Sequence, residues 1–246
     1  MRNKVNILGV NVDMVNVKGA ADKIMQFLNE GGLHKVFTPN SEIIMAAYKD
    51  NSFKEILNDA DLLTADGIGV VYASKILGKP IAERAPGYDI ACELLGRINN
   101  TSYSVFLFGG KPGVAETAKE KLQSRYDGLN IAGIRNGYFK EEEVPEIIDE
   151  INNSGADIVF VCLGAPKQEM WIAENAQKLN AKVAMGIGGS LDVFAGTALR
   201  APEFYCKHGL EWFYRLMKQP SRAGRILALP KFGLTVLLKG RKFMQD

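Results

Sequence analysis

Apolar, strand-like runs alternate with helical patterns along the first 200 residues of the chain. Strand followed by helix, repeated, predicts an α/β fold: a Rossmann-like, doubly wound and mostly parallel sheet with helices on both faces. In such sheets ligands bind beyond the carboxyl ends of the strands, so the residues directly after each strand are the candidates for a site. The predicted strands are 5–10, 35–38, 61–64, 103–108, 130–135, 157–163 and 182–187, and the predicted helices lie near 18–30, 41–49, 51–59, 67–77, 87–98, 112–126, 141–153 and 167–179.

The strand pattern stops after Arg200, and the remaining residues show helical patterns alone. The sequence therefore predicts two parts: an α/β body over 1–199 and a helical appendage over 200–246. The appendage has ten basic residues against three acidic ones, a net charge of +7, while the body has 20 basic and 25 acidic residues, a net charge of −5. A basic segment on an acidic body suggests an anionic partner.

Large apolar residues are interleaved with the bases of the appendage, which is the composition of a segment that lies at a membrane surface. Its longest uncharged run, Phe232 to Leu238, has seven residues, well short of the ~20 that a spanning helix needs. The appendage is thus expected to lie on a membrane without crossing it. Exposed leucines also favour self-association, so we expect a homo-oligomer in solution that charged substitutions at Leu216, Leu227 and Leu237 would disrupt.

Composition excludes several classes of protein. With 47% hydrophobic residues and 30 basic against 28 acidic residues among 246, the chain is a folded globular protein and not a disordered one. Its three cysteines are far apart with no CxxC, and its two histidines form no cluster, so structural zinc and a disulfide framework are disfavoured. The N-terminal apolar stretch is soon interrupted by Asn11 and Asp13, which fits no signal peptide. A cytoplasmic protein is expected.

Three glycine turns follow three of the predicted strands. The first, FLFGGKPGVAE, places Gly109 and Gly110 between a strand and a helix start, where exposed N–H groups attract phosphate. The same turn is needed in proteins that bind nothing, so alone it is weak. Its spacing is GGxxG, and no acid ends the next strand, which disfavours a nicotinamide dehydrogenase. No GxxxxGK[ST] motif occurs either.

The other two glycine turns strengthen the prediction of a phosphate-binding site. LGAPKQEMW shapes a turn with Gly164 and then places Lys167 and Gln168 at a helix start, facing a ligand, while Glu169 suits the helix dipole. GIGGSLDVFAG follows the last strand and offers Asp192 among small residues. Three such turns outline one crevice for an anion or a nucleotide.

Polar groups of another kind end the second and third strands. Thr38 and Asn40 follow the second, and Asp66 stands between the third strand and a glycine. A carboxylate there is placed to act as a general base on a hydroxyl, or it is the N-cap of the helix that begins near Ile68. Arg84, in a later loop, either binds an anion or pairs with Glu83.

A metal site is not indicated. The DAD motif of Asp59 to Asp61 precedes its strand, which puts it at the wrong edge of the sheet for the crevice and makes a helix end its expected role. A diphosphate leaving group would then be neutralised by arginine, lysine and backbone N–H groups. Arg215, Arg222 and Arg225 of the appendage are the candidates.

Together these motifs resemble the WecG/TagA/CpsF family of bacterial glycosyltransferases, glycosyltransferase family 26. The resemblance runs in order over nearly the whole chain, and within the family it is strongest to the N-acetylmannosaminyltransferases that make the linkage unit of wall teichoic acid. The matching segments are TPNSE (38–42), ADGIGVVYASKILG (65–78), ER-APG-YD (83–89), VFLFGGKPGVAE (105–116), NGYF (136–139), LGAPKQEMWI (163–172), GIGGSLDVFAG (186–196), RAPEF (200–204) and GLEWFYRLMKQPSR (209–222).

The resemblance implies an inverting, metal-independent enzyme without a cofactor. It would move N-acetylmannosamine from UDP-N-acetylmannosamine to N-acetylglucosamine on an undecaprenyl diphosphate carrier. Carried over by motif, Asp66 would be the base that deprotonates the acceptor hydroxyl, with Thr38, Asn40, Arg84 and Gln168 around the reacting sugars.

The resemblance also implies how the donor and the membrane are bound. Tyr138 would stack on uracil, and the appendage would dock on the inner face of the cytoplasmic membrane and bring its arginines to the acceptor diphosphate. Pro86 departs from the family pattern, which has Thr before the glycine, and this weakens detailed claims about that loop. The residues that would hold UDP are Gly109, Gly110, Tyr138, Gly164, Gly188, Gly189 and Asp192.

Three alternatives remain open on the sequence. UDP-N-acetylmannosaminuronic acid or UDP-glucose could be the donor, for another surface polysaccharide. A non-catalytic sensor of sugar nucleotides would use the crevice for binding alone, although it need not keep a carboxylate at Asp66. A nucleic-acid-binding protein would use the basic appendage, but the low aromatic-plus-basic content outside the appendage argues against that function.

Overall fold

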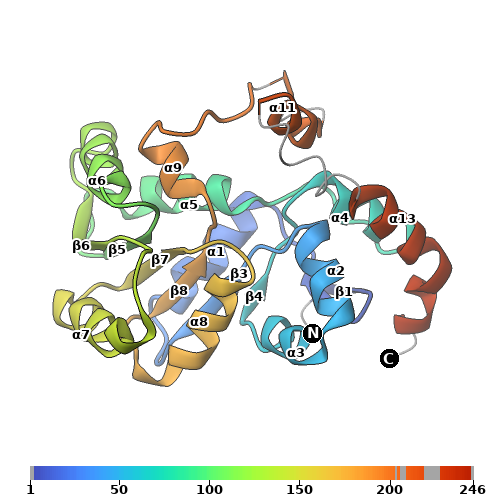
Figure 1. Ribbon diagram of the computed structural model, residues 1–246, viewed down its shortest axis with the longest axis horizontal. Helices are drawn as coiled ribbons and strands as arrows, with labels where there is room; N and C mark the ends of the chain where they lie inside the picture. The colour runs from blue at the N-terminus through green and yellow to red at the C-terminus, as the bar shows by residue number, and fades with distance from the viewer. Residues whose placement is uncertain (1–2, 203, 206–208, 219–227, 245–246) are drawn as a thin grey trace.

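The computed structural model describes residues 3–202, 204–205, 209–218 and 228–244, although not the side chains of 215, 216, 218 and 228. Six parallel strands form one sheet in the order β4-β3-β8-β7-β5-β6, seen in Figure 1. This confirms the predicted α/β, Rossmann-like fold. The strands of the sheet are β3 (His34–Phe37), β4 (Leu62–Leu63), β5 (Ser104–Gly109), β6 (Asn130–Arg135), β7 (Ile158–Cys162) and β8 (Val183–Gly186).

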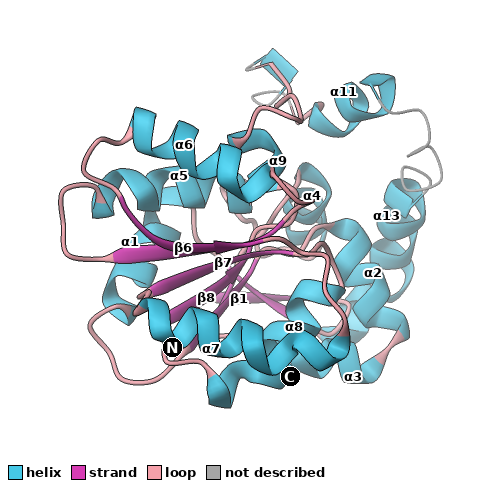
Figure 2. Ribbon diagram, turned by 60° about the vertical axis from the view of Figure 1, so that its left-hand side comes forward, coloured by secondary structure: helices cyan, strands magenta, loops and turns pink. Residues whose placement is uncertain are grey.

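Helices cover both faces of the sheet because successive residues of each strand point to opposite faces. In β5, Val105 and Leu107 belong to the core cluster that includes α1, α5, α6 and α9, whereas Phe106 and Phe108 belong to the cluster that includes α2, α3, α7 and α8. Figure 2 shows α5, α6 and α9 on one side of the sheet and α7 and α8 on the other. Both faces of the sheet are therefore buried, as in other parallel sheets.

The helices agree with the predicted ones to within a few residues, and α9 is an additional short helix in the last glycine turn. Asn40 and Asp50 cap α2 and α3, since each side chain accepts two backbone N–H bonds of its helix. The helices are α1 (Val17–Phe27), α2 (Ser41–Lys49), α3 (Asn51–Asn58), α4 (Ile68–Ile76), α5 (Gly87–Ile98), α6 (Val114–Arg125), α7 (Val144–Ser154), α8 (Lys167–Asn175), α9 (Ser190–Phe194), α11 (Glu211–Lys218) and α13 (Ala228–Lys239), with 3-10 turns η1 (Glu141–Glu143), η2 (Ala176–Lys178) and η4 (Gly240–Phe243).

The first predicted strand, 5–10, is wrong as a single strand. The segment folds into an antiparallel hairpin of β1 (Lys4–Ile7) and β2 (Val10–Asp13), outside the parallel sheet. Leu8 and Gly9 have φ of 55° and 93°, the left-handed values that a two-residue hairpin turn requires at both positions. A leucine at the first of these positions hides the turn from sequence analysis, because Leu rarely adopts positive φ.

The C-terminal helices lie on one side of the body, α13 against α2 and α4 (Figure 1). Phe232 and Val236 of α13 are 2% and 1% exposed and belong to the core cluster of that face. The outer side of α13 is apolar, with Leu237 61% exposed, whereas Leu227 and the side chain of Leu216 lie outside the described residues. Among the helices that the structure describes, none combines the length and apolar character that a membrane crossing would require.

The division of the chain at residue 200 stays a prediction. The helical content after that point agrees with it. The core contribution of Phe232 and Val236, however, means that the second half of the appendage packs on the body as one of its layers.

Candidate functional site

The glycine turn after β5 lies at the point where the sheet reverses its winding. β5 is followed by its outer neighbour β6, whereas β7 is followed by β8 on the other side, so a crevice is expected between the carboxyl ends of β5 and β7. Gly109 has a φ of 135°, and a Cβ there would stand 2.3 Å from the Cys162 carbonyl oxygen. The N–H of Gly110 donates to that same oxygen, at 3.2 Å. Gly109 is thus required for the two strand ends to meet, while the Gly110 N–H bond joins them.

An open pocket of about 570 Å³ lies beside these turns. Tyr138, 65% exposed, and Lys167 both line it, although they come from the loops after β6 and β7. The Gly137 N–H donates to the Gly110 carbonyl at 2.8 Å, which fastens the tyrosine loop to the glycine turn. The Lys167 Nζ lies 4.2 Å from the centre of the Phe139 ring. A flat aromatic ring and a cation in one hollow suit a nucleotide.

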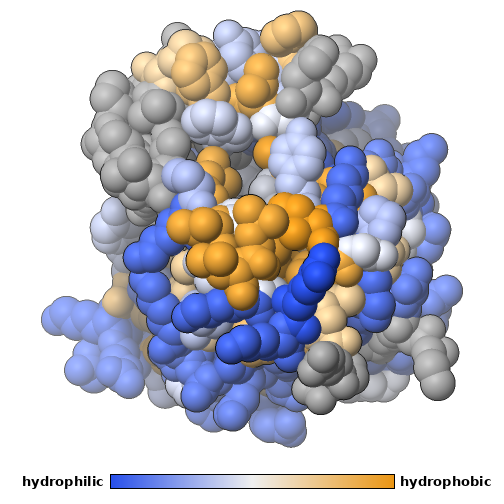
Figure 3. All heavy atoms as spheres, turned by 90° about the vertical axis from the view of Figure 1, so that its right-hand side faces the viewer, coloured by the Kyte–Doolittle hydropathy of each residue, from blue (hydrophilic) through white to orange (hydrophobic). Residues whose placement is uncertain are grey.

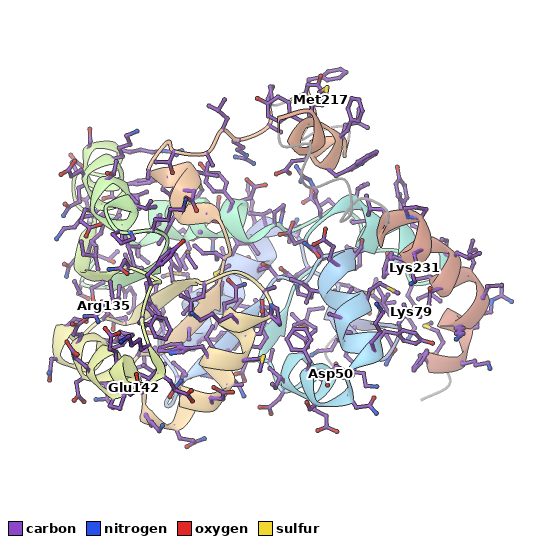
Figure 4. The ribbon with its side chains drawn as sticks, in the orientation of Figure 1. Asp50, Lys79, Arg135, Glu142, Met217 and Lys231 are labelled. Atoms are coloured by element: carbon purple, nitrogen blue, oxygen red, sulfur yellow. The ribbon has the colours of Figure 1, made fainter. Side chains whose placement is uncertain are left out.

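Arg135, at the end of β6, is already paired with carboxylates beside this pocket. Its guanidinium donates to Glu150 at 2.6 Å and to Glu143 at 3.1 Å. Arg135 and Glu142 lie on the α7 side of the molecule, away from Lys231 on α13 (Figure 4). The cation available to the pocket from its lining residues is therefore carried by Lys167 and Lys140.

Gln168 joins the loops after β7 and β8. Its side chain is 3% exposed; its Oε1 accepts the Gly188 N–H at 2.9 Å and its Nε2 donates to Glu169 Oε1 at 2.8 Å. Glu169 is 1% exposed, and its other carboxylate oxygen has no hydrogen-bond partner. Burial raises the pKa of Glu169, while the bond from Gln168 opposes that shift. Gln168 is therefore a structural brace of the crevice, a role that the sequence did not indicate.

Thr38 and Asn40 lie at the carboxyl end of β3, as predicted. Thr38 is 7% exposed and its Oγ1 donates to the Gly186 carbonyl at 3.3 Å. A Cβ at Gly87 would stand 2.9 Å from that hydroxyl, so the start of α5 packs directly on it. The Asn40 side-chain oxygen accepts the N–H groups of Glu42 and Ile43, which commits that oxygen to the cap of α2.

Asp66 lies beside these residues at the end of β4. Its N–H donates to the Pro39 carbonyl at 3.1 Å, and a Cβ at Gly67 would stand 3.8 Å from the Asn40 Cβ. The N-cap of α4 is Gly67, with a φ of 104°. Asp66 therefore lies one residue before the N-cap position, and its role as base or cap stays a prediction. Asp66 is half-buried and follows β4 at the carboxyl edge of the sheet.

Arg84 is held next to Asp66 by the backbone, since the Ala85 N–H donates to the Ala65 carbonyl at 2.8 Å. Its Nη1 donates to Glu211 of α11 at 2.6 Å. Pairing with Glu83, one of the two alternatives for Arg84, is thus replaced by pairing with Glu211. Sequence spacing gives no sign of this partner, because the two residues are 127 positions apart.

The remaining predicted residues are placed as follows. Gly164 adopts a φ of 76°, and a Cβ there would meet no atom within 4 Å. Gly188 and Gly189 form the turn between β8 and α9, and Asp192 lies in the first turn of α9, where Thr197 Oγ1 donates to it at 3.4 Å. Arg215 lies on α11, but its side chain lies outside the described residues, as do Arg222 and Arg225 entirely.

The DAD motif lies at the opposite end of the sheet from the crevice, as predicted. Asp59 ends α3 and pairs with Lys35, and Asp61 accepts the Lys35 N–H at 2.9 Å before β4 begins. Across the described part of the chain, no group of three or more His, Cys, Asp or Glu side chains is arranged to hold a metal ion. Metal independence itself stays a prediction.

Known proteins have sequences similar to this chain over most of its length. A profile of the "Glycosyl transferase WecG/TagA/CpsF family" matches residues 5–245. The chain is 39% identical over 202 residues to an N-acetylglucosaminyldiphosphoundecaprenol N-acetyl-beta-D-mannosaminyltransferase of Bacillus spizizenii, covering 82% of this chain and 78% of the relative. It is 36% identical over 241 residues to the enzyme of the same name in Staphylococcus aureus, covering 97% and 94%.

Proposed function

Because this chain belongs to the glycosyl transferase WecG/TagA/CpsF family, we propose that it transfers N-acetylmannosamine from UDP-N-acetylmannosamine to N-acetylglucosamine on undecaprenyl diphosphate. The chain is a glycosyltransferase by its family, and the names of its relatives in Bacillus and Staphylococcus specify the acceptor and the transferred sugar. In this proposal the product is the linkage unit of wall teichoic acid. The enzyme works without a metal at the cytoplasmic face of the membrane.

One observation carries the proposal: the nucleotide-like pocket and the Asp66 carboxylate lie at the same, carboxyl edge of one parallel sheet, and hydrogen bonds connect the strand ends between them. Tyr138 and Lys167 line the pocket. Gln168, next to Lys167 in sequence, is hydrogen-bonded to Gly188 of the loop after β8. The neighbouring strand β3 ends at Thr38, whose hydroxyl is bonded to Gly186, and Asp66 is bonded through its backbone to Pro39. A donor lying along this line would bring its sugar to Asp66.

The chemistry proposed for these residues is a single displacement. Asp66 takes the proton of the acceptor hydroxyl, and the oxygen attacks C1 of the donor sugar from the face opposite UDP. The bond between C1 and the diphosphate oxygen breaks, UDP leaves with the electron pair, and the configuration at C1 is inverted. Lys167 and the N-terminal N–H groups of α8 stabilise the charge that develops on the diphosphate. Arg215, Arg222 and Arg225 are proposed to bind the diphosphate of the acceptor.

The test is the release of UDP from UDP-N-acetylmannosamine with a lipid-diphosphate-linked N-acetylglucosamine acceptor, in EDTA. Asp66→Asn should lower kcat by about 10²- to 10⁴-fold, the usual contribution of a general base. Asp50→Asn is the matched control, since Asp50 caps α3 and Asn is an equally good cap; its turnover should equal that of the wild type.

Each other outcome counts against a stated part of the proposal. Turnover that EDTA abolishes would refute metal independence. Turnover only with UDP-N-acetylmannosaminuronic acid or UDP-glucose would refute the donor. Tight binding of UDP without turnover of any of the three donors would refute the transferase and favour a sensor.

A further inference from the structure

An apolar groove that the proposed reaction does not yet use lies between α4 and α13. Its volume is about 230 Å³, larger than the engineered apolar cavity of about 150 Å³ that takes up benzene. Trp212 of α11 is one of its lining residues. The remaining lining residues are Ile68, Gly69, Tyr72, Ala73 and Ile76 of α4 and Leu229, Phe232 and Gly233 of α13.

The hollow exists because small residues lie where the two helices face each other. A Cβ at Gly69 would stand 3.2 Å from Leu229, and a Cβ at Gly240 would stand 2.8 Å from Leu77, so α13 runs parallel to α4 from its first turn to beyond its last. Between these contacts, a Cβ at Gly233 would meet no atom within 4 Å. Larger side chains at such positions would fill the space and bury the apolar walls, so the gap leaves apolar surface open.

The groove leads away from the candidate base. Ile68 and Gly69 follow Asp66 by two and three residues, and α4 then extends for ~13 Å at 1.5 Å per residue. Arg84 next to Asp66 is bonded to Glu211, and the next residue, Trp212, lines the groove. One end of the groove is therefore at the site of reaction.

The surroundings of the groove complement a prenyl diphosphate lipid, since they offer an apolar path for its chain and positive charge for an anionic group. Lys75 has its Nζ 5.7 Å from the ring centre of Tyr72, and Lys79 and Lys231 lie on the same side of the molecule as α13 (Figure 4). Figure 3 shows an apolar patch on this side, ringed by hydrophilic residues. Leu234, Leu237 and Leu238 of α13 are 58%, 61% and 70% exposed there.

We propose that the groove between α4 and α13 binds the first isoprene units of the acceptor lipid while its sugar lies at Asp66. This inference rests on the proposed function, in which the acceptor is a sugar on a prenyl diphosphate. The groove takes the segment next to the diphosphate, and the rest of the chain continues past α13 into the bilayer. Binding of this segment holds the acceptor in line with the base, and it makes the enzyme select prenyl diphosphates over soluble sugar phosphates.

The direct test is calorimetric titration with farnesyl diphosphate, below its micelle threshold, and with inorganic diphosphate as the tail-free probe. Gly233→Leu fills the groove from a helical position with open space. Gly96→Leu is the matched control: Gly96 is an exposed glycine of α5 whose Cβ would likewise meet no atom within 4 Å. In both, leucine favours the helix over glycine.

The wild type should bind farnesyl diphosphate more tightly than diphosphate. Gly233→Leu should weaken farnesyl diphosphate at least tenfold and leave diphosphate unchanged, Gly233→Ala should have a smaller effect, and Gly96→Leu should have none. Equal affinity for the two probes in the wild type, or unchanged farnesyl affinity in Gly233→Leu, would overturn the proposal. The proposal would also be overturned if Gly233→Leu lost binding to acceptor-free vesicles of phosphatidylglycerol and phosphatidylcholine but still bound farnesyl diphosphate, because the groove would then be a membrane contact.

Turnover separates this proposal from the proposed function. If the wild type transfers sugar, Gly233→Leu should raise KM at least tenfold for a prenyl-linked acceptor and not for its methyl-diphosphate analogue; an equal KM for both would refute the groove alone. If the wild type transfers nothing, the proposed function fails, and the farnesyl diphosphate titration still decides whether the groove binds a prenyl chain.

Discussion

Replacing Gln168 by Met should destabilise the fold substantially, although the site looks like one that contacts substrate. The side chain is 3% exposed and holds two hydrogen bonds, to the Gly188 N–H and to Glu169 Oε1. Methionine has a similar volume, so packing changes should cost less than about 1.5 kcal/mol. The expected loss therefore comes from the two bonds.

The magnitude follows from the partners that remain. Gly188 is half-buried, so water can bond to its N–H once the Gln168 oxygen is gone. Losing this hydrogen bond should lower the free energy of unfolding by about 1 kcal/mol, the lower end for an unsatisfied buried group. Glu169 is 1% exposed and loses the bond to its carboxylate, worth about 1.5–3 kcal/mol. The sum is about 3 kcal/mol, or ~6–12 °C in Tm for a chain of this size. The Gln168 bond lowers the pKa of Glu169, which means that it stabilises the charged carboxylate. Gln168→Met should therefore lower the free energy of unfolding more at high pH, where Glu169 is charged.

Urea unfolding followed by far-ultraviolet circular dichroism measures this loss. Gln123→Met is the control, since Gln123 is an exposed glutamine of α6 and its replacement should change the unfolding free energy by less than about 0.5 kcal/mol. If Gln168→Met is as mild as the control but abolishes turnover, the brace is refuted and Gln168 acts on the substrate.

Two further predictions concern stability. Burial raises the pKa of Glu169, so the contribution of this carboxyl to stability is fully present below its unfolded pKa of about 4.3 and is lost as the pH rises through its folded pKa. Glu169→Gln escapes this loss, so the unfolding free energy of the variant relative to the wild type should rise with pH in urea titrations from pH 4 to 8. A difference that is constant over that range would contradict the assignment. Phe232→Ala should lower the free energy of unfolding by about 3–5 kcal/mol, because Phe232 is 2% exposed in the core. Leu238→Ala is the control, and since Leu238 is 70% exposed the change should be less than about 0.5 kcal/mol. Equal effects in the same unfolding assay would show that α13 is not part of the folded body.

The predictions of secondary structure were confirmed where neighbouring residues in the sequence are enough to decide the local structure. The six strands of the parallel sheet and the helices between them follow from alternating apolar runs and turn residues. Pattern failed at the hairpin of β1 and β2, where Leu8 adopts a positive φ that no local rule favours for leucine. It also missed α9, because a five-residue helix is too short to show a period.

In the candidate site, too, the sequence predicted the positions of residues but not their contacts with distant residues. Thr38, Asp66, Gly109 and Lys167 lie at or soon after the carboxyl ends of strands, as predicted, and a parallel sheet brings such residues to one edge. Their partners were not found. Glu211 neutralises Arg84 across 127 residues, a distance at which sequence spacing carries no information about contact.

The sequence by itself determined the fold class and the family to which the chain belongs, and it predicted the edge of the sheet for the candidate site, since these depend on period, turn residues and motifs within short segments. The tertiary structure decided that Gln168 is fixed between Gly188 and Glu169, and that the chain opens a groove beside Asp66 between α4 and α13. The physical reason is that buried hydrogen bonds and helix packing depend on which segments the complete core brings together, and each of those contacts joins residues whose own local sequence is satisfied without it.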